Sequence, residues 1–485
     1  MQKLSDIIKE LSVLEIVNEQ DCRVDSLVFD SRKAKAGAVF VAVKGTVADG
    51  HVFIPQVISA GCQCVVCEEF PETTPSDVTF VKVKDSSSAL GQMASAFYGH
   101  PSRQLKLVGV TGTNGKTTTA TLMYDLVMQM GYKAGLFSTV ANYIGQTQLQ
   151  ATHTTPDAVS LNRIMAEMVE AGCEYCFMEV SSHALVQNRA AGLKFTGGLF
   201  TNITHDHLDY HKTFKAYIDA KKSFFDGLDK EAFALVNGDD KNGNVMVQNC
   251  KAQKYTFSIR SIGDFRCKII ESMFEGMQLE IDNQEIWTQF IGGFNAQNLL
   301  AVYGSACLLG LDKSEIQVAL SQLKPVDGRF ETIRSASGKT AIVDYAHTPD
   351  ALKNVIATIN QVRQPNQQLI SVVGAGGDRD PLKRPEMAKE AIVGSSKVIL
   401  TSDNPRSEDP DEIITQMMDG VAFKERIKVL SIVNRREAIR TACMVAGAGD
   451  IILIAGKGHE TYQEIKGVRH HFDDREVVNE VFNEE

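Results

Sequence analysis

The sequence lacks the features that mark several broad classes of protein. Its 485 residues contain no uninterrupted apolar run of about 18 residues, the length that a membrane-spanning helix requires. The N-terminus shows no apolar secretory core. No basic tract stands out and the net charge is −10, which argues against a nucleic-acid-binding protein. We therefore expect a soluble, cytoplasmic protein with no nucleic-acid partner and no membrane insertion.

The ten cysteines do not follow the usual arrangement of a metal site or a disulfide framework. Cys62, Cys64 and Cys67 form C-x-C-x-x-C, and Cys173 with Cys176 forms C-x-x-C. Both groups lie in apolar, strand-like stretches, where cysteine acts as a small hydrophobic residue. Zinc sites usually place such pairs in turns. The sequence therefore predicts structural cysteines.

Length and pattern predict an α/β protein of three domains, since about 150 residues per domain is typical. No tandem repeat or low-complexity linker interrupts the chain. Residues 1–100 read as a small α/β domain, in which residues 1–16 show helical spacing. Residues 101–328 alternate strands and helices, as in a mostly parallel, P-loop-like sheet. Residues 329–485 repeat that alternation and predict a doubly wound, Rossmann-like domain.

The chain is organised around a glycine-rich stretch, LKLVGVTGTNGKTTTA, at residues 105–120. An apolar run gives way to a loop that ends in Gly115, Lys116 and Thr117, and a helix-like segment follows. A strand, a glycine loop and a helix N-terminus make a phosphate site, because backbone N–H groups approach the anion and the helix dipole favours negative charge. Lys116 would contact the β and γ phosphates, and the Thr117 hydroxyl would contact Mg²⁺.

One lysine lies where an apolar side chain is expected. Between residues 214 and 228, apolar residues recur at helical spacing and define an inward stripe. Lys221 falls on this stripe, whereas Lys222 faces away. A lysine on an apolar face is costly unless it is paired, chemically altered or snorkelling to solvent, and snorkelling is the usual outcome.

Polar motifs follow strand-like segments in both large domains. Four such motifs in the C-terminal part are DYAHTPDAL, GAGGDRDPLKRPEM, SDNPR and GKGHE. In doubly wound sheets, ligands gather beyond the carboxyl ends of the strands. Glu179 ends a strand of the central part, where a solvated side chain is the alternative to a Mg²⁺ contact. Residues 205–211 hold three histidines and two aspartates, a candidate for metal or phosphate chemistry with a polar loop as the alternative.

The loop G-x-x-G-T-N-G-K-T has Val110 where the common P-loop has glycine, and this variant resembles the ATP loop of the Mur ligases and their folylpolyglutamate synthetase relatives. These ATP-dependent acid–amino-acid ligases join a carboxylate to an amine. Further motifs follow in the order seen in Mur ligases: DSR, TTP, EVSSHAL, DHLDYH, AKKSFF, FNAQN, DYAHTPDAL, DNPR and GKGHE. The resemblance covers nearly the whole chain. It implies peptidoglycan synthesis through an acyl-phosphate intermediate.

The resemblance implies a nucleotide and metal site in the central domain. For ATP it implies Gly112, Thr113, Asn114, Gly115, Lys116, Thr117, Thr118, Asn295, Asn298, Arg329 and Asp344, with helix capping as the alternative for Asn295. The implied catalytic residues are Lys116, Glu179, His207 and Lys221. In the family this lysine is carbamylated, and Thr117, Glu179, His207 and carbamylated Lys221 would hold two Mg²⁺ ions.

The resemblance also implies two further substrates. For UDP-N-acetylmuramoyl-L-alanyl-D-glutamate, bound in part by a UDP-binding N-terminal domain, it implies Ser31, Lys44, Gly45, Thr46, Thr154, Thr155, Ser182, Gln187 and Arg189. A capped turn is the alternative for Ser31, and a surface arginine for Arg189. For meso-diaminopimelate it implies Arg379, Asp403, Asn404, Pro405, Arg406, Gly456 and Glu460. Arg406 would bind the distal carboxylate bidentately, and Glu460 the distal ammonium.

Three other readings stay open at this point. The added amino acid could be L-lysine, although an arginine left unpaired would disfavour it. A folylpolyglutamate synthetase shares the ATP loop but has no use for the DSR segment or the DNPR motif. A GTP-dependent switch would need N-K-x-D, and the sequence contains no Asn-Lys pair. We expect a monomer.

Overall fold

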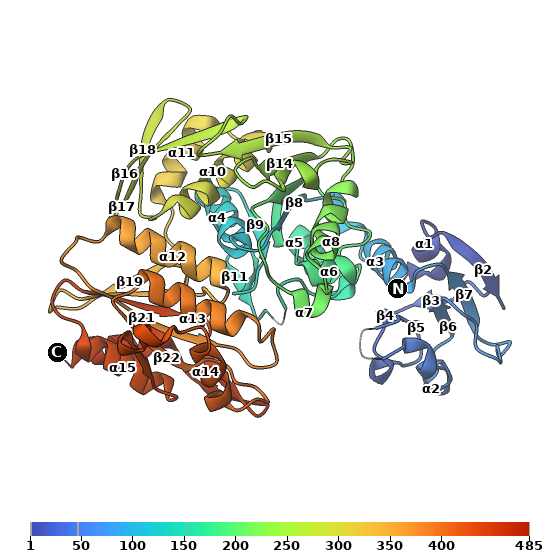
Figure 1. The fold of residues 1–485 in the computed structure, drawn as a ribbon. Helices are drawn as coiled ribbons and strands as arrows, with labels where there is room; N and C mark the ends of the chain where they lie inside the picture. The colour runs from blue at the N-terminus through green and yellow to red at the C-terminus, as the bar shows by residue number, and fades with distance from the viewer. Residues whose placement is uncertain (1, 46–47, 152, 485) are drawn as a thin grey trace.

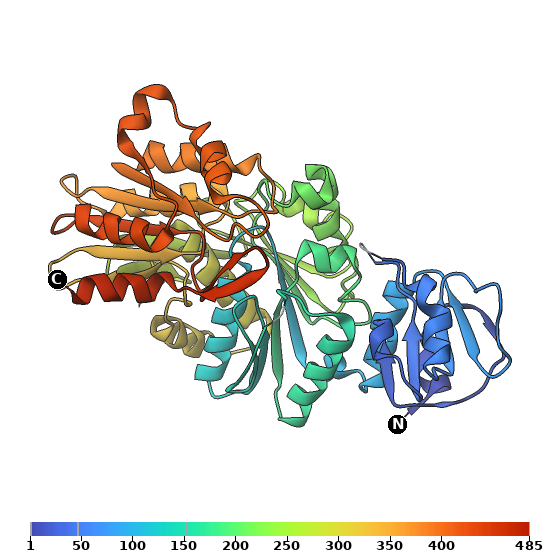
Figure 2. The same cartoon turned by 90° about the horizontal axis from the view of Figure 1, so that it is seen from below.

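The computed structural model describes residues 2–45, 48–151 and 153–484, and it contains three α/β units (Figures 1 and 2). In both views the N-terminal unit, drawn in blue, lies at one end of the molecule. The central unit separates it from the orange and red C-terminal unit. The α/β fold class with mostly parallel sheets, predicted from the alternation of strands and helices, is confirmed.

The N-terminal unit is a five-stranded sheet in the order β2-β7-β6-β5-β4, with β2 antiparallel and the rest parallel. Its helix α3 packs against α5 (Ala158–Glu170) of the central unit. The elements are β1 (Gln2–Lys3), α1 (Leu4–Ile8), β2 (Val13–Val17), β3 (Arg23–Val24), β4 (Ser26–Val28), η1 (Ser31–Lys33), β5 (Ala38–Val41), η2 (Gly50–Phe53), α2 (Ile54–Ser59), β6 (Cys64–Cys67), β7 (Thr79–Val83) and α3 (Ser86–Phe97).

The helical spacing of residues 1–16 indicates a longer first helix than the structure contains. Helix α1 ends at Ile8, and Val13–Val17 forms strand β2 paired with β7. Three of the five residues of β2 are β-branched, which favours a strand once a partner strand is available. The cysteine prediction is confirmed for the strands, since Cys64 and Cys67 are buried in β6. None of the ten cysteines, all of which lie in the described ranges, forms a disulfide.

The central unit is an eleven-stranded sheet in the order β11-β10-β9-β12-β8-β13-β14-β15-β16-β17-β18. Its middle strands, from β9 to β16, are parallel, and antiparallel hairpins extend both edges. The strands are β8 (Lys106–Thr111), β9 (Ala134–Phe137), β10 (Asn142–Ile144), β11 (Thr147–Leu149), β12 (Tyr175–Glu179), β13 (Gly197–Phe200), β14 (Phe233–Asn237), β15 (Gln253–Ser258), β16 (Phe265–Met273), β17 (Gly276–Ile281) and β18 (Gln284–Thr288).

Helices cover both faces of the central sheet. Strand β8 shows why, since Val108 and Val110 pack into one apolar cluster with α4 and α10, while Leu107 packs into another with α5 and α8. A strand buried on both faces is typical of parallel sheets. The helices are η3 (Pro101–Arg103), α4 (Lys116–Gln129), α6 (Ser182–Val186), α7 (Leu208–His211), α8 (Phe214–Asp226), α9 (Gly243–Met246), α10 (Gly293–Leu308) and α11 (Lys313–Gln322).

The C-terminal unit is a six-stranded sheet in the order β19-β20-β24-β21-β22-β23, parallel except for β19. Helices α12, α13 and α14 cover one face, and α15 and α16 the other. The elements are β19 (Glu331–Arg334), β20 (Thr340–Asp344), α12 (Pro349–Val362), β21 (Leu369–Ala375), α13 (Lys383–Gly394), β22 (Lys397–Ser402), α14 (Pro410–Met418), η4 (Phe423–Lys428), β23 (Val429–Ser431), α15 (Arg435–Val445), β24 (Ile451–Ala455), β25 (Tyr462–Ile465), β26 (Val468–His471) and α16 (Asp474–Asn483).

The topology places four strand ends of the C-terminal unit side by side. Strands β20, β24, β21 and β22 are parallel neighbours, so the motifs that follow them meet at one edge of the sheet, as predicted. That edge faces the loops after β8, β12 and β13 of the central unit. Across the described ranges, no helix is both long and apolar enough to cross a membrane.

Candidate active site

A cleft of about 860 Å³ lies between the central and C-terminal units. It is lined from one side by the loops after β8, β12 and β13, and from the other by the loops after β20, β21, β22 and β24. The predicted residues that line it are Thr113, Asn114, Gly115, Lys116, Thr117, Thr118, Thr154, Thr155, Glu179, Ser182, Gln187, Arg189, His207, Lys221, Asn295, Asn298, Arg329, Asp344, Arg379, Asp403, Asn404, Arg406, Gly456 and Glu460.

The glycine loop at residues 112–115 borders the cleft through residues 113–115, and Gly112 does not line it. Gly112 has φ 151°, and a Cβ there would lie 1.9 Å from the Thr201 hydroxyl, so only glycine fits. Gly115 has φ 85° and is the N-cap of α4, which begins at Lys116. The Lys116 ammonium donates to the Gly112 and Thr113 carbonyls at 3.0 and 2.8 Å, and burial lowers its pKa. A phosphate placed on this helix N-terminus would meet free N–H groups and a cation.

Lys221 reaches the same loop from α8. Its side chain is 1% exposed, and Nζ donates to the Gly112 carbonyl at 2.7 Å and lies 4.7 Å from the Tyr217 ring centroid. The inward position predicted from helical spacing is confirmed, and the snorkelling alternative is wrong. Burial, and then the nearby Lys116 ammonium, lower the Lys221 pKa. Lys222 faces away and pairs with Asp226 at 2.6 Å.

Glu179 and His207 provide further polar groups near the loop. Glu179 ends β12 with 1% exposure, and its Oε1 accepts a hydrogen bond from the Thr139 N–H at 2.6 Å, so the solvated alternative is wrong. His207 is the N-cap of α7 with φ 54°, and burial lowers its pKa to about 3, which keeps the imidazole neutral. A neutral imidazole can act as a metal ligand.

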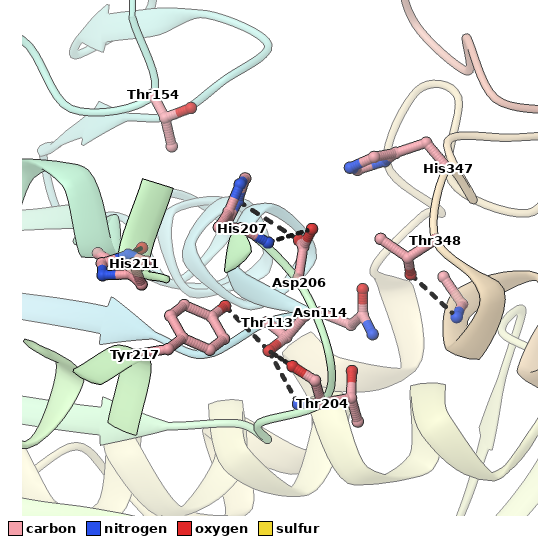
Figure 3. A network of polar contacts seen from close by, with 12 residues as sticks. Thr113, Asn114, Thr154, Thr204, Asp206, His207, His211, Tyr217, His347 and Thr348 are labelled. Carbon is pink, nitrogen blue, oxygen red and sulfur yellow. Dashed lines mark hydrogen bonds and ion pairs between the residues drawn. The ribbon is translucent and has the colours of Figure 1, made fainter. Parts of the chain in front are cut away.

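Two polar residues that were given no individual role from the sequence, Asp206 and Lys383, connect the two units. Asp206, 4% exposed at its side chain, forms an ion pair with Lys383, and its Oδ2 lies 3.4 Å from His207 Nε2. Figure 3 shows His347 of the C-terminal unit facing Asp206 and His207 across the cleft. In the sequence, the dense polar run at residues 205–211 indicated that Asp206 could be functional. No sequence pattern indicated that it pairs with Lys383, which lies 177 residues away along the chain.

Arg329, in the segment that joins the central and C-terminal units, lies close to the glycine loop. Arg329 Nη2 donates to the Thr117 hydroxyl at 3.1 Å, and its guanidinium lies 4.5 Å from the Tyr345 ring centroid. Asp344 accepts hydrogen bonds from the Phe330 and Ala346 N–H groups at 2.7 and 2.8 Å. These contacts place a cation beside the start of α4, where phosphate charge would gather.

Asn295 and Asn298 lie on α10, nearly buried at 6% and 7% exposure. The N-cap of α10 is Gly292, and the Asn295 amide instead donates to the Ile291 carbonyl at 3.0 Å. The capping alternative for Asn295 is therefore wrong. Both side chains line the cleft beside the glycine loop.

A polar wall continues from the glycine loop along the loops after β12. Arg189 is half-buried; its Nη1 donates to the Thr155 carbonyl at 2.7 Å and its Nε to Gln187 Oε1 at 2.9 Å. The surface-arginine alternative is wrong, because these bonds fix the guanidinium against the cleft. Thr154 Oγ1 accepts a hydrogen bond from the Thr139 hydroxyl at 3.1 Å, and Ser182 begins α6.

Three predicted residues of the N-terminal unit that the structure describes, Ser31, Lys44 and Gly45, do not line this cleft. Ser31 begins η1, whose N-cap is Asp30, because the Asp30 carboxylate accepts from the Arg32 N–H at 3.1 Å. Lys44 and Gly45 lie in the loop after β5, where Lys44 pairs with Glu68 at 3.1 Å. The capped-turn alternative describes this segment correctly, although the cap is Asp30. Thr46 lies outside the described residues.

The far end of the cleft carries charges of both signs. Arg406 has φ 52°, and its backbone N–H bonds to the Glu464 carbonyl of β25 at 3.0 Å, while its Nη1 donates to the Gly377 carbonyl at 2.6 Å. Arg379 is exposed nearby. Asp403, Asn404 and Glu460 face the same space, and Pro405 does not line it. Two guanidinium groups and two carboxylates suit a small zwitterion.

Together these groups suit phosphoryl transfer next to an amine site. The loop amides, Lys116 and Arg329 would neutralise phosphate charge. Thr117 and Glu179 offer hydroxyl and carboxylate oxygens, the donor type that Mg²⁺ prefers beside nucleotide phosphates, and His207 lines the same cleft. The Glu179 carboxylate is 1% exposed, and buried carboxylates usually pair with a cation or coordinate a metal.

Three family models match the chain in sequence. The "Mur ligase family, catalytic domain" matches residues 23–98, the "Mur ligase middle domain" residues 110–306, and the "Mur ligase, glutamate ligase domain" residues 328–458. These matches fall on the three units seen in the structure.

Two relatives that are more than half identical over nearly the full length carry the same name. The UDP-N-acetylmuramoyl-L-alanyl-D-glutamate–2,6-diaminopimelate ligase of Phocaeicola vulgatus is 56% identical over 483 residues, covering 100% of both chains. Its counterpart from Bacteroides thetaiotaomicron is 54% identical over 480 residues, covering 99% of this chain and 100% of that one. A solved structure of a ligase with the same name superposes with a TM-score of 0.71 at 31% identity, covering 100% of this chain and 99% of the other.

Proposed function

The chain belongs to the Mur ligase family of ATP-dependent ligases, and we propose that it adds meso-diaminopimelate to UDP-N-acetylmuramoyl-L-alanyl-D-glutamate in peptidoglycan synthesis. Relatives with this activity in their names match it from end to end at 54–56% identity. The observation that carries the substrate assignment is the position of Arg406, which lines the cleft from the C-terminal unit and donates to the Gly377 carbonyl, whereas the glycine loop lines it from the central unit. The two sides provide separate sites for an amino acid and for phosphates.

The first chemical step activates the D-glutamate carboxylate. A carboxylate is a poor acylating agent, so its oxygen attacks the γ-phosphorus of ATP, ADP leaves, and an acyl phosphate forms. The Lys116 ammonium and the loop amides stabilise the charge that spreads over the transferred phosphoryl group. Arg329, hydrogen-bonded to Thr117, adds a second cation at the same place.

The second step forms the amide bond. The neutral amine of diaminopimelate attacks the acyl carbon, and the tetrahedral intermediate expels phosphate while the nitrogen loses a proton. The polar wall around Arg189 and Thr155 would hold the peptide of the UDP substrate beside the loop. Uridine diphosphate would lie on the N-terminal unit against Ser31, Lys44 and Gly45, with Thr46 as a further contact.

We propose that Thr117, Glu179 and His207 hold Mg²⁺, with Lys221 as a carbamate for the second of two ions. Bound Mg²⁺ would neutralise phosphate and carboxylate charge. The structure supports carbamylation by the convergence of Lys116 and Lys221 on one carbonyl oxygen, at 3.0 and 2.7 Å. Two ammonium groups so close repel each other, whereas a carbamate on Lys221 would pair with Lys116 and carry oxygens suited to the metal.

The charges at the far end of the cleft favour diaminopimelate over L-lysine. The two amino acids differ by a distal carboxylate, which Arg406 could bind bidentately. With lysine bound, that guanidinium would lose its partner inside a closing cleft, and such unpaired groups cause strong rejection. Asp403 and Glu460 would bind the distal ammonium. A folylpolyglutamate synthetase would need neither these groups nor the N-terminal unit.

We also propose domain boundaries at residues 1–100, 101–328 and 329–485, and action as a cytoplasmic monomer. The three sheets and the three family matches support the boundaries. One chain builds the whole cleft, so the chemistry described above needs no second copy.

The test of the function is the identity of the product. Purified protein with Mg²⁺, ATP, UDP-N-acetylmuramoyl-L-alanyl-D-glutamate and meso-diaminopimelate should form the UDP-tripeptide, seen by mass spectrometry, with one ADP and one phosphate per amide bond. Omitting any one substrate should stop product formation. Product formation without ATP, or none with the complete mixture, would refute the proposal.

A further inference from the structure

Lys457 carries a buried positive charge behind the amino-acid end of the cleft. Its side chain is 0% exposed, and its Nζ donates to Glu460 Oε2 at 3.1 Å and to Asn404 Oδ1 at 3.3 Å. Asp403 Oδ1 lies 4.0 Å from the same nitrogen. A charge this enclosed is costly unless its partners are well placed, so these contacts fix the ammonium in one position.

Lys457 does not reach the cleft, although its neighbours do. Gly456, Glu460, Asp403 and Asn404 line the cavity, and Lys457 lies behind them. The side chain therefore acts through the groups it holds. A second bond fixes the same arrangement, since the Asn404 amide donates to Glu460 Oε2 at 2.8 Å.

The buried lysine balances two carboxylates that face one small space. Burial, and then the neighbouring Asp403, raise the pKa of Glu460, while Lys457 opposes the rise. Asp403 and Asn404 follow β22, and Tyr345 follows β20; Tyr462 on β25 and Arg435 on α15 also lie within electrostatic reach of Glu460. Arg379 and Arg406 line the same cleft. Without Lys457, two acids and no adjacent ammonium would remain.

We propose that Lys457 is a positioning residue for amino-acid recognition: it holds Glu460 and Asn404 in place, and its ammonium lies against the two acidic side chains, Glu460 and Asp403, that receive the distal ammonium of the amino acid. This inference rests on the proposed function and deepens it. The GKGHE motif thus combines a glycine and a glutamate that border the cleft with a lysine that pairs with the glutamate from behind.

The variant Lys457→Met should raise the KM for meso-diaminopimelate by about tenfold at neutral pH, as expected when a contact to an ionised group is lost. The KM for ATP and for the UDP substrate should stay near the wild-type values. Lys457→Gln, which keeps a hydrogen-bond donor but removes the charge, should show the same KM change and is the variant to use where methionine prevents folding. Lys424→Met, an exposed lysine of the same unit, is the matched control.

The pH dependence separates this role from a structural one. Lys457 lowers the pKa of Glu460, so its removal raises that pKa and keeps Glu460 protonated to a higher pH than in the wild type. The ratio of variant to wild-type KM should therefore fall as the pH rises and Glu460 ionises in the variant. In the double variant Lys457→Gln with Glu460→Gln, that fall should disappear.

The outcomes distinguish the inference from the function. Failure of the wild-type protein to use diaminopimelate would refute the proposed function. Turnover by the wild type together with an unchanged KM for diaminopimelate in a folded Lys457 variant would overturn the inference alone. A KM increase that does not change with pH, or that is equally large for ATP, would also overturn it, because loss of general packing would then explain the defect.

Discussion

The variant Lys116→Met is expected to lower kcat by about 10³-fold, the loss seen when a group that stabilises transition-state charge is removed. Among the described residues, the Lys116 ammonium donates to the carbonyls of Gly112 and Thr113. Phosphates on the glycine loop would replace those carbonyls as its partners. The measurement is phosphate release at saturating concentrations of all three substrates.

Lys215→Met is the matched control for this prediction. Lys215 is a lysine of α8 whose side chain is 84% exposed, so its removal should leave kcat unchanged. The melting temperature of Lys116→Met should stay close to that of the wild type, because a cation is removed from a cleft and not from a packed core. A kcat within about tenfold of the wild-type value would contradict the role assigned to Lys116.

The variant Lys221→Ala is expected to lower kcat by about 10²-fold or more, because the carbamate that it removes would position a metal ion and pair with Lys116. The same helix provides the control. Lys222 faces away from the cleft and pairs with Asp226, so Lys222→Ala should retain activity. A small carboxylate such as acetate, added to Lys221→Ala, should restore part of the rate by occupying the vacated space.

Direct detection of the carbamate gives an independent test. Wild-type protein equilibrated with ¹³C-labelled bicarbonate should show a carbamate carbon signal by NMR, and Lys221→Ala should not. Equal activity of Lys221→Ala and wild type would contradict the proposal. An active wild-type enzyme with no labelled carbon would show that Lys221 acts as an amine.

Local patterns in the sequence were sufficient to predict much of the fold. The glycine loop, the parallel strands and the inward position of Lys221 follow from periodicity over a few turns, and the structure confirms them. The helical spacing of residues 1–16 did not predict strand β2, because the pairing of β2 with β7 overrides the local preference. The alternative that Asn295 caps a helix was wrong because Gly292 is the N-cap of that helix.

The parts that the sequence did not predict are contacts between distant segments. In the sequence, Lys457 is simply one residue of the GKGHE motif. Only the folded structure shows that it is buried and bonded to Glu460 and Asn404. The pair of Asp206 and Lys383 joins two units and leaves no local pattern. The roles of the individual site residues remain predictions that the variants above would test.

The most direct test of the central claim is phosphate release from ATP with UDP-N-acetylmuramoyl-L-alanyl-D-glutamate, comparing meso-diaminopimelate with L-lysine at equal concentration. The account predicts turnover with diaminopimelate and a kcat/KM for lysine lower by about 10⁴-fold, as for sites built around a polar group that the wrong substrate leaves unpaired. Equal or preferred turnover of lysine would contradict the assignment of Arg406 to the distal carboxylate.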